Sequence, residues 1–178
     1  MKTFQAPIIF LDHDGVICLR GNWGSRFKKA QRWAKEHDIA MAGFYERPDL
    51  PVGVLFDDFD QKAVKVLNGI INETGADIIV SSDWRLHADL PALQRFYLEQ
   101  GVIKGPIGMT GICRDAQFEE ARVKEIQGWL EQSPRPNWVA VDDMDLSALG
   151  RFVHTPRSSE GIKQSGVAEK IIRLLKEP

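Results

Sequence analysis

The sequence predicts an α/β protein, a three-layer sandwich with a mainly parallel β-sheet. Residues 8–11, 76–80 and 138–141 form short runs that are apolar at nearly every position. Such runs are typical of strands that are buried on both faces, as they are in parallel sheets. Segments with helical periodicity separate the runs, and this alternation favours helices on both faces of one sheet.

Apolar stripes at helical spacing predict five helices. They cover about residues 25–37, 63–75, 89–100, 117–132 and 167–175. Ser25 is the expected N-cap of the first helix, and Gly75 and Gly101 are expected to end the second and the third. Two shorter strands are expected, one within residues 102–109 and one at residues 151–155.

Two aspartates directly follow the first strand. Because side chains alternate along a strand, Asp12 and Asp14 are expected on the same side, with His13 opposite. Open α/β sheets bind ligands at the carboxyl ends of their strands. Two crowded carboxylates repel each other unless a cation lies between them, and hard oxygen ligands suit Mg²⁺. Asp-x-Asp-Gly is also an ordinary strand-to-turn sequence, so the motif needs support from the rest of the chain.

The next two apolar strands also end in polar residues. The hydroxyl of Ser81 can donate to a phosphate oxygen at this edge of the sheet, unless Ser81 or Ser82 simply caps the next helix. Asp142 and Asp143 directly follow the third strand. Trp84 and Arg85 either pack and face solvent or line the entrance to the site, and both interpretations remain open.

The position of Arg122 in the predicted helix of residues 117–132 is informative. Arg122 lies four residues before Ile126 and therefore borders the buried stripe of its helix, whereas Lys124 is expected to point elsewhere. An arginine beside a buried face needs an anionic partner, although its side chain can also extend to solvent. Both interpretations of Arg122 remain open from its position in the sequence.

A small insertion of about residues 19–56 follows the first motif, within a single domain that spans residues 1–178. The basic residues of its helix form either a solvated face or part of a small cap that attracts a polyanion. In the second case, Trp23, Phe27 and Trp33 are candidates for stacking on a base. The acidic residues 57–60 are a rival metal site, but capping of the next helix explains them better.

The composition excludes several classes of protein. The formal net charge of −2 gives no general argument for binding to nucleic acid or membrane. Cys18 and Cys113 are far apart without metal-ligand spacing, so free thiols in a reducing compartment are expected. We see neither a signal peptide nor an apolar stretch that spans a bilayer, and the expectation is a cytoplasmic protein with no membrane partner.

Together, the motifs resemble the haloacid dehalogenase (HAD) superfamily of phosphotransferases. Residues 8–16, 78–81 and 139–143 resemble its first, second and fourth motifs in the correct order. A closer resemblance, to the small HAD domains of Swiss-army-knife RNA repair proteins, rests on residues 80–85, 108–110, 122–130 and 141–143. The resemblance covers nearly the whole chain outside the insertion and implies a HAD/Rossmann-like sheet with a small helical cap.

The resemblance also implies roles for individual residues. Asp12 would be the nucleophile that forms an aspartyl-phosphate, and Asp14 would act as general acid and then as general base. Asp12, the backbone carbonyl of Asp14, and Asp142 would hold Mg²⁺, with Asp143 assisting. The superfamily's third motif is a lysine or arginine, for which Arg122 is our choice and Lys124 the reserve; Ser81 would bind the phosphoryl group.

The expected activity is hydrolysis of a phosphomonoester. The family likeness and the basic helix favour nucleotides or nucleic-acid 3′-phosphate ends as substrates. A phosphatase for small phosphorylated metabolites or phosphoproteins is one alternative, and a non-catalytic HAD-fold binding module is another. Fold-level analogy does not select among these substrates, and the sequence leaves the oligomeric state open.

Overall fold

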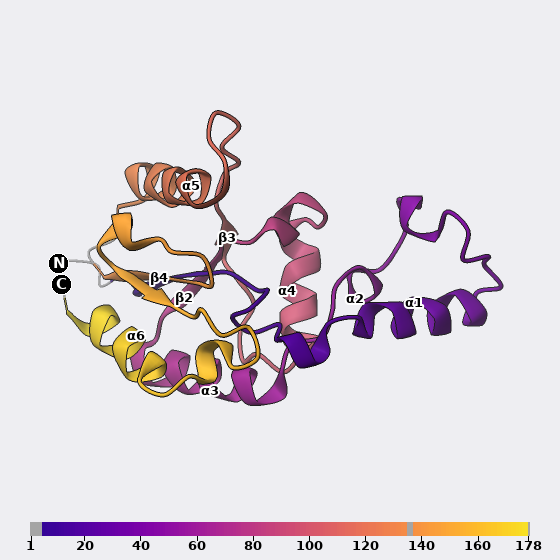
Figure 1. Ribbon diagram of the computed structural model, residues 1–178, viewed down its shortest axis with the longest axis horizontal. Helices are drawn as coiled ribbons and strands as arrows, with labels where there is room; N and C mark the ends of the chain where they lie inside the picture. Colours follow the sequence, from indigo (N-terminus) through magenta and orange to yellow (C-terminus); the bar gives the residue numbers. More distant parts are fainter. Residues whose placement is uncertain (1–4, 135–136, 178) are drawn as a thin grey trace.

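The computed structural model describes residues 5–134 and 137–177 and has one five-stranded parallel sheet in the order β3-β2-β1-β4-β5 (Figure 1). Its strands are β1 (Ile8–Leu11), β2 (Asp77–Val80), β3 (Gly108–Met109), β4 (Trp138–Asp142) and β5 (Phe152–His154). In register, Leu11 pairs with Val80 on one side and Val141 on the other. The residues after these three positions therefore meet at one edge of the sheet.

Helices cover both faces of this sheet, which confirms the predicted three-layer α/β architecture. Helix α5 (Phe118–Gln132) packs through Ile126 on the face that carries Phe10 and Ile79. The opposite face packs against α3 (Gln61–Thr74), α4 (Leu90–Glu99) and α6 (Val167–Lys176). In the part of the chain that is described, no helix combines the length and the hydropathy needed to cross a membrane.

The ends of α3 confirm the predicted capping residues, whereas the start of α1 does not. Gly75 ends α3 in the left-handed region at φ 69°, and Asp60 caps its start by accepting from the Ala63 amide at 2.9 Å. The prediction that Ser25 is an N-cap is wrong. Gly24 holds that position, and the Ser25 hydroxyl instead accepts from the Asp58 amide at 2.8 Å, so it connects its helix to a distant loop.

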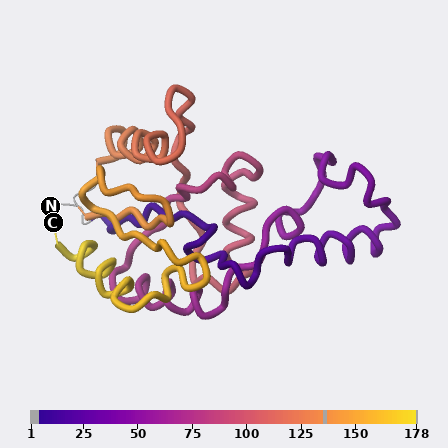
Figure 2. Tube along the Cα trace, in the orientation of Figure 1, coloured from indigo at the N-terminus to yellow at the C-terminus, as the bar shows by residue number. Residues whose placement is uncertain are grey.

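The segment between β1 and α3 carries α1 (Ser25–Glu36) and α2 (Val52–Leu55) and projects away from the sheet (Figure 1, Figure 2). It has a small hydrophobic cluster of its own. At its base, the Lys29 ammonium donates to the Phe56 carbonyl at 2.9 Å and pairs with Asp58 at 2.6 Å. These contacts hold the projecting segment beside the carboxyl end of the sheet.

Candidate active site

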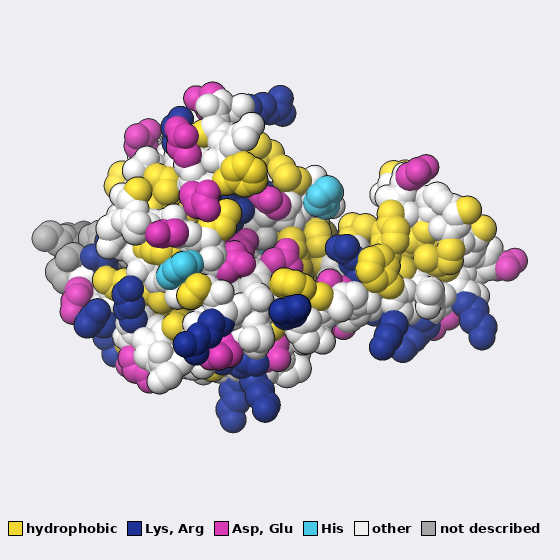
Figure 3. All heavy atoms as spheres, viewed as in Figure 1, with side chains coloured by type: hydrophobic (Ala, Val, Ile, Leu, Met, Phe, Trp, Pro, Cys, Tyr) yellow, Lys and Arg dark blue, Asp and Glu magenta, His cyan; other side chains and the backbone are white. Residues whose placement is uncertain are grey.

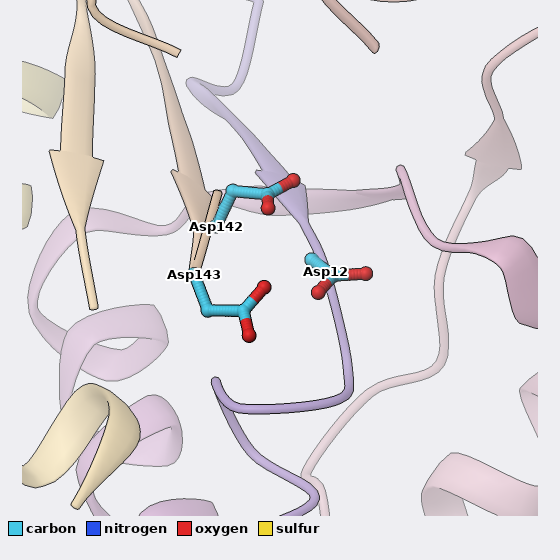
Figure 4. A group of neighbouring side chains, drawn as sticks. All are labelled: Asp12, Asp142 and Asp143. Carbon is cyan, nitrogen blue, oxygen red and sulfur yellow. The ribbon is translucent and has the colours of Figure 1, made fainter. Parts of the chain in front are cut away.

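Three carboxylates converge where β1 and β4 end. Asp12 follows β1, Asp142 ends β4 and Asp143 comes next, and Figure 4 shows their carboxylates pointing toward one another. One oxygen from each lies within 4.8 Å of the others. Asp12 and Asp142 are buried, and the parallel register of β1 and β4 brings them together across the sheet.

The crowding perturbs the titration of these carboxyl groups. Burial, and next the charge of Asp142, raise the pKa of Asp12 well above its usual range, and Arg122 opposes the rise. Burial likewise raises the pKa of Asp142 to about 6, and it raises that of Asp143. The cluster therefore has more negative charge than its surroundings readily stabilise, so a cation bound among these oxygens would relieve the repulsion.

Arg122 is the cation that reaches this cluster. Its Nη1 donates to Asp12 at 3.2 Å, to Asp142 at 3.0 Å and to the backbone carbonyl of Ser81. Its side chain is only 6% exposed although it is charged, so its carboxylate partners stabilise it in place of water. The helix therefore presents this arginine where the spacing of its apolar stripe indicated.

Lys124, the reserve candidate, does not join the cluster. It lies on the outer face of α5, where its ammonium pairs with Glu120 at 2.9 Å in an i, i+4 arrangement. Its side chain is 43% exposed, and it lines a different cleft beside Cys113 and Trp129. Of the two candidates, Arg122 is therefore the one that contacts the carboxylates.

A second ion pair, which we did not predict, supports Arg122. Glu125 lies one helical turn after Arg122, with its carboxylate 3.7 Å from the arginine Nε. The same carboxylate pairs with Arg85, whose side chain is only 4% exposed. The i, i+3 spacing of Arg122 and Glu125 was a usable signal. Nothing local indicated the role of Arg85, because its partner lies 40 residues away.

Ser81 lies at the end of β2 beside these charges. It is 1% exposed, and its hydroxyl oxygen has no hydrogen-bond partner among the described residues. It does not cap the following turn, because the neighbouring Ser82 accepts from the Trp84 amide there. A buried hydroxyl without a partner is costly, so it is suited to a ligand that supplies one.

Asp14 lies apart from the three converging carboxylates. One of its oxygens accepts a hydrogen bond from the Trp84 indole at 2.9 Å. Burial raises the pKa of Asp14, and the bond from Trp84 opposes that rise. Trp84 therefore has a polar contact with a candidate catalytic carboxyl, which goes beyond either interpretation offered by the sequence.

His13 points away from the site, as strand alternation predicts. It is fully buried, its Nε2 lies 2.5 Å from the Tyr97 hydroxyl, and its ring packs 4.4 Å from that of Trp84. Burial lowers the pKa of His13 to about 3, so the ring is neutral near pH 7. Its role is to pack beneath the site.

Gly15 shapes the turn after the two aspartates. Its φ is +75°, and a Cβ at this position would lie 2.4 Å from an Asp143 carboxylate oxygen. Only glycine therefore allows this backbone to pass so close to the carboxylate cluster.

The rival acidic cluster of residues 57–60 has structural roles. Asp60 caps α3, while Asp57 accepts from the Arg26 amide at 2.8 Å, which satisfies a donor in the first turn of α1. Asp58 pairs with Lys29. Within the described residues, the group with the spacing to hold a metal ion is that of Asp12, Asp142 and Asp143.

The central parallel sheet and the acidic strand ends define an α/β protein with a candidate metal site at the carboxyl edge of its sheet. A family model described as "HAD domain in Swiss Army Knife RNA repair proteins" matches residues 8–167, and the chain belongs to this family. The predicted resemblance is thus confirmed. No significant match was found to a curated protein or to a solved structure. Family membership indicates a HAD-type hydrolase or phosphatase activity in general terms, and HAD proteins generally use a divalent metal.

Proposed function

We propose that the protein is a Mg²⁺-dependent phosphomonoester hydrolase that works through an aspartyl-phosphate on Asp12. The observation that carries the proposal is the convergence of three carboxylates, an almost fully buried arginine and an unpartnered serine hydroxyl at one edge of the sheet. A purely structural module gains nothing from crowded carboxylates, which destabilise the fold when they are ionised without a cation.

The donor set suits a hard divalent cation. Asp12, Asp142 and Asp143 offer three carboxylates with oxygens within 4.8 Å of one another, and none of them is a soft ligand. These residues, with the backbone carbonyl of Asp14, would hold Mg²⁺. When bound, the ion would shield the nucleophile from the negative phosphate and stabilise charge on the phosphoryl oxygens.

The side chains supply the remaining chemistry. An Asp12 oxygen forms a bond to phosphorus while the bond from phosphorus to the leaving oxygen breaks, and Asp14 gives its proton to that oxygen. Asp14 then takes a proton from water, whose oxygen attacks phosphorus and releases the Asp12 carboxylate. Ser81 donates to a phosphoryl oxygen, and Arg122 balances the negative charge.

The proposed substrates are nucleotides or nucleic-acid 3′-phosphate ends. The family name, which refers to RNA repair proteins, supports this choice. Of the three aromatic side chains considered for stacking, Phe27 lines a cleft beside the insertion. Trp33 instead packs against Phe44 within the insertion, and the Trp23 indole donates to the Cys18 carbonyl.

Phosphate release from a panel of phosphomonoesters tests the proposal. The panel contains 3′-phosphorylated oligonucleotides, free nucleotides, sugar phosphates and a phosphopeptide, each with Mg²⁺ or with EDTA. Turnover that requires Mg²⁺ and disappears in Asp12→Asn supports the proposal, and the preferred substrate decides among the substrate classes. If the protein neither turns over any substrate nor binds Mg²⁺, the proposal fails and a non-catalytic module remains.

A further inference from the structure

A cleft of about 540 Å³ lies between the insertion and the main body, apart from the carboxylate cluster. Arg26, Phe27, Tyr45 and Phe56 line it from the insertion, and His87 lines it from the main body. Its volume is in the range of small-molecule sites. In Figure 3, the hydrophobic side chains of the insertion and the acidic side chains of the main body gather on the same face of the molecule.

Trp84 connects this cleft to the candidate active site. Its indole donates to the Asp14 carboxylate at 2.9 Å, and its ring stacks on Phe56 with centroids 4.2 Å apart and planes 4° from parallel. Phe56 in turn lines the cleft. The wall of the cleft therefore packs against the tryptophan that contacts Asp14, which places the cleft on the side of the site where Asp14 is proposed to protonate the leaving oxygen.

The cleft offers flat apolar faces. Phe27 is 48% exposed and Tyr45 is 44% exposed, and their rings meet edge to face with centroids 6.3 Å apart. Aromatic rings exposed beside a cleft are suited to stacking on a planar group, since every nucleobase has such a face. A sugar phosphate has no planar group for these rings.

The cleft also contains a cation that is available to an anion. The guanidinium of Arg26 lies 5.0 Å from the centre of the Phe27 ring and has no ion pair among the described residues. Arg47, in contrast, is neutralised by a bidentate pair with Asp49. The proposed function assigns the phosphomonoester to Ser81 on the main body, so Arg26 remains for a second anionic group on the same substrate.

We propose that this cleft binds the terminal nucleoside of a single-stranded nucleic acid, with the base against Tyr45 or Phe27 and the adjoining phosphodiester at Arg26. The proposal rests on the proposed function, because the phosphomonoester at the carboxylate cluster fixes which group enters the cleft. An arginine beside exposed aromatic rings suits a phosphodiester joined to a base.

Binding without turnover tests the cleft independently of catalysis. A 5′-labelled single-stranded oligonucleotide with a 3′-phosphate is titrated, with Mg²⁺ present, against Asp12→Asn alone and combined with Tyr45→Ala or Arg26→Gln. Each cleft change should weaken binding roughly tenfold. Arg32→Gln is the matched control, because Arg32 lies on the same helix, is exposed and does not line the cleft.

The salt dependence separates stacking from charge. Arg26→Gln should reduce the slope of log affinity against log salt by about 0.7, the value for one phosphate contact on a single strand, and Tyr45→Ala should leave the slope unchanged. An unlabelled nucleoside 3′-monophosphate should compete at least about tenfold more weakly than the oligonucleotide, because it lacks the phosphodiester.

Several outcomes would overturn the proposal. These are absence of oligonucleotide binding, equal effects of Arg32→Gln and the cleft changes, and equal competition by the mononucleotide. Thermal unfolding of each variant shows that it is folded. If binding depends on the cleft but no phosphomonoester is turned over, the proposed function fails and the cleft remains. If turnover requires Asp12 but ignores the cleft changes, the cleft proposal fails alone.

Discussion

Replacing Arg122 with methionine tests the charge balance of the site most sharply. Arg122 contacts Asp12 at 3.2 Å and Asp142 at 3.0 Å, and its side chain is 6% exposed. Methionine keeps much of the side-chain volume but leaves two buried carboxylates facing each other. Removing one partner from a buried ion pair costs about 3–5 kcal/mol, so we expect a loss of that size in the free energy of unfolding.

Lys124→Met is the matched control, because both residues lie on α5 and carry the same charge. Lys124 is 43% exposed, and solvent screens its i, i+4 pair with Glu120. For a chain of this size, 1 kcal/mol shifts Tm by roughly 2–4 °C, so the expected shift is roughly 6–20 °C for Arg122→Met, and the shift for Lys124→Met should be far smaller.

The assays are thermal unfolding, which gives the shifts in Tm, and urea unfolding at pH 5 and pH 7.5, each in EDTA and again in excess Mg²⁺. Mg²⁺ should reduce the deficit of Arg122→Met, since a cation among the carboxylates offsets part of the lost charge. Because Asp142 has a pKa of about 6 when folded and 3.8 as its ordinary value, the folded state holds extra protons between these values. Ionisation of Asp142 therefore lowers stability as the pH rises through this range, and the Arg122→Met deficit should be larger at pH 7.5 than at pH 5.

Three results would contradict this charge balance. The first is a loss below about 1 kcal/mol for Arg122→Met, which would mean that solvent screens the pair as it screens a surface pair. The second is a deficit that does not depend on pH or on Mg²⁺. The third is an equal loss in Arg122→Met and Lys124→Met, which would remove the distinction between the two cations.

Three further predictions concern the residues around the carboxylates. Gly15→Ala should weaken Mg²⁺ binding, measured by calorimetry, because its Cβ would lie 2.4 Å from the Asp143 carboxylate. The control Gly75→Ala has similar backbone strain at φ +69° but no clash, so it should only reduce stability. Equal Mg²⁺ affinity in both variants would contradict the assignment of Asp143 to the metal site. Trp84→Phe removes the hydrogen bond to Asp14, the proposed general acid. It should slow the hydrolysis of alkyl phosphates about tenfold more than that of p-nitrophenyl phosphate, whose leaving group needs little protonation. Equal slowing of both substrates would show that Trp84 has a merely structural role. His13 has a pKa of about 3 in the folded protein against an ordinary value of 6.5, so the unfolded state takes up a proton as the pH falls below 6.5. Urea unfolding should therefore show that the wild-type protein loses about 1 kcal/mol of unfolding free energy between pH 6.5 and about 5.5, and that His13→Gln does not. Identical pH profiles would contradict the neutral buried ring.

Much of the fold could be predicted because its signals are local. Continuous apolar runs indicate the buried strands, and Gly75 ends its helix as predicted. The prediction of Ser25 as an N-cap is wrong because its hydroxyl accepts from the Asp58 amide, and the sequence near Ser25 does not indicate a tertiary contact of this kind. The placement of the projecting insertion depends on such contacts as well, through Lys29.

The same division applies to the site. Asp12 and Asp142 could be paired in advance because parallel strands end at a common edge, and Arg122 followed from its helical spacing. Arg85 and Trp84 could not be assigned, because each acts through a partner distant in the chain. Side-chain direction after a strand end depends on turns that sequence patterns do not specify.

Trapping the phosphoryl group on the protein is the most direct test for an aspartyl-phosphate on Asp12. The protein is mixed with its best ³²P-labelled phosphomonoester for a single turnover in Mg²⁺ and quenched in acid. We expect label on the wild-type protein that hydroxylamine releases, as it does from an acyl phosphate, and no label on Asp12→Asn. Phosphate release that proceeds in Asp12→Asn at the wild-type rate, with no labelled protein in either form, would contradict the aspartyl-phosphate.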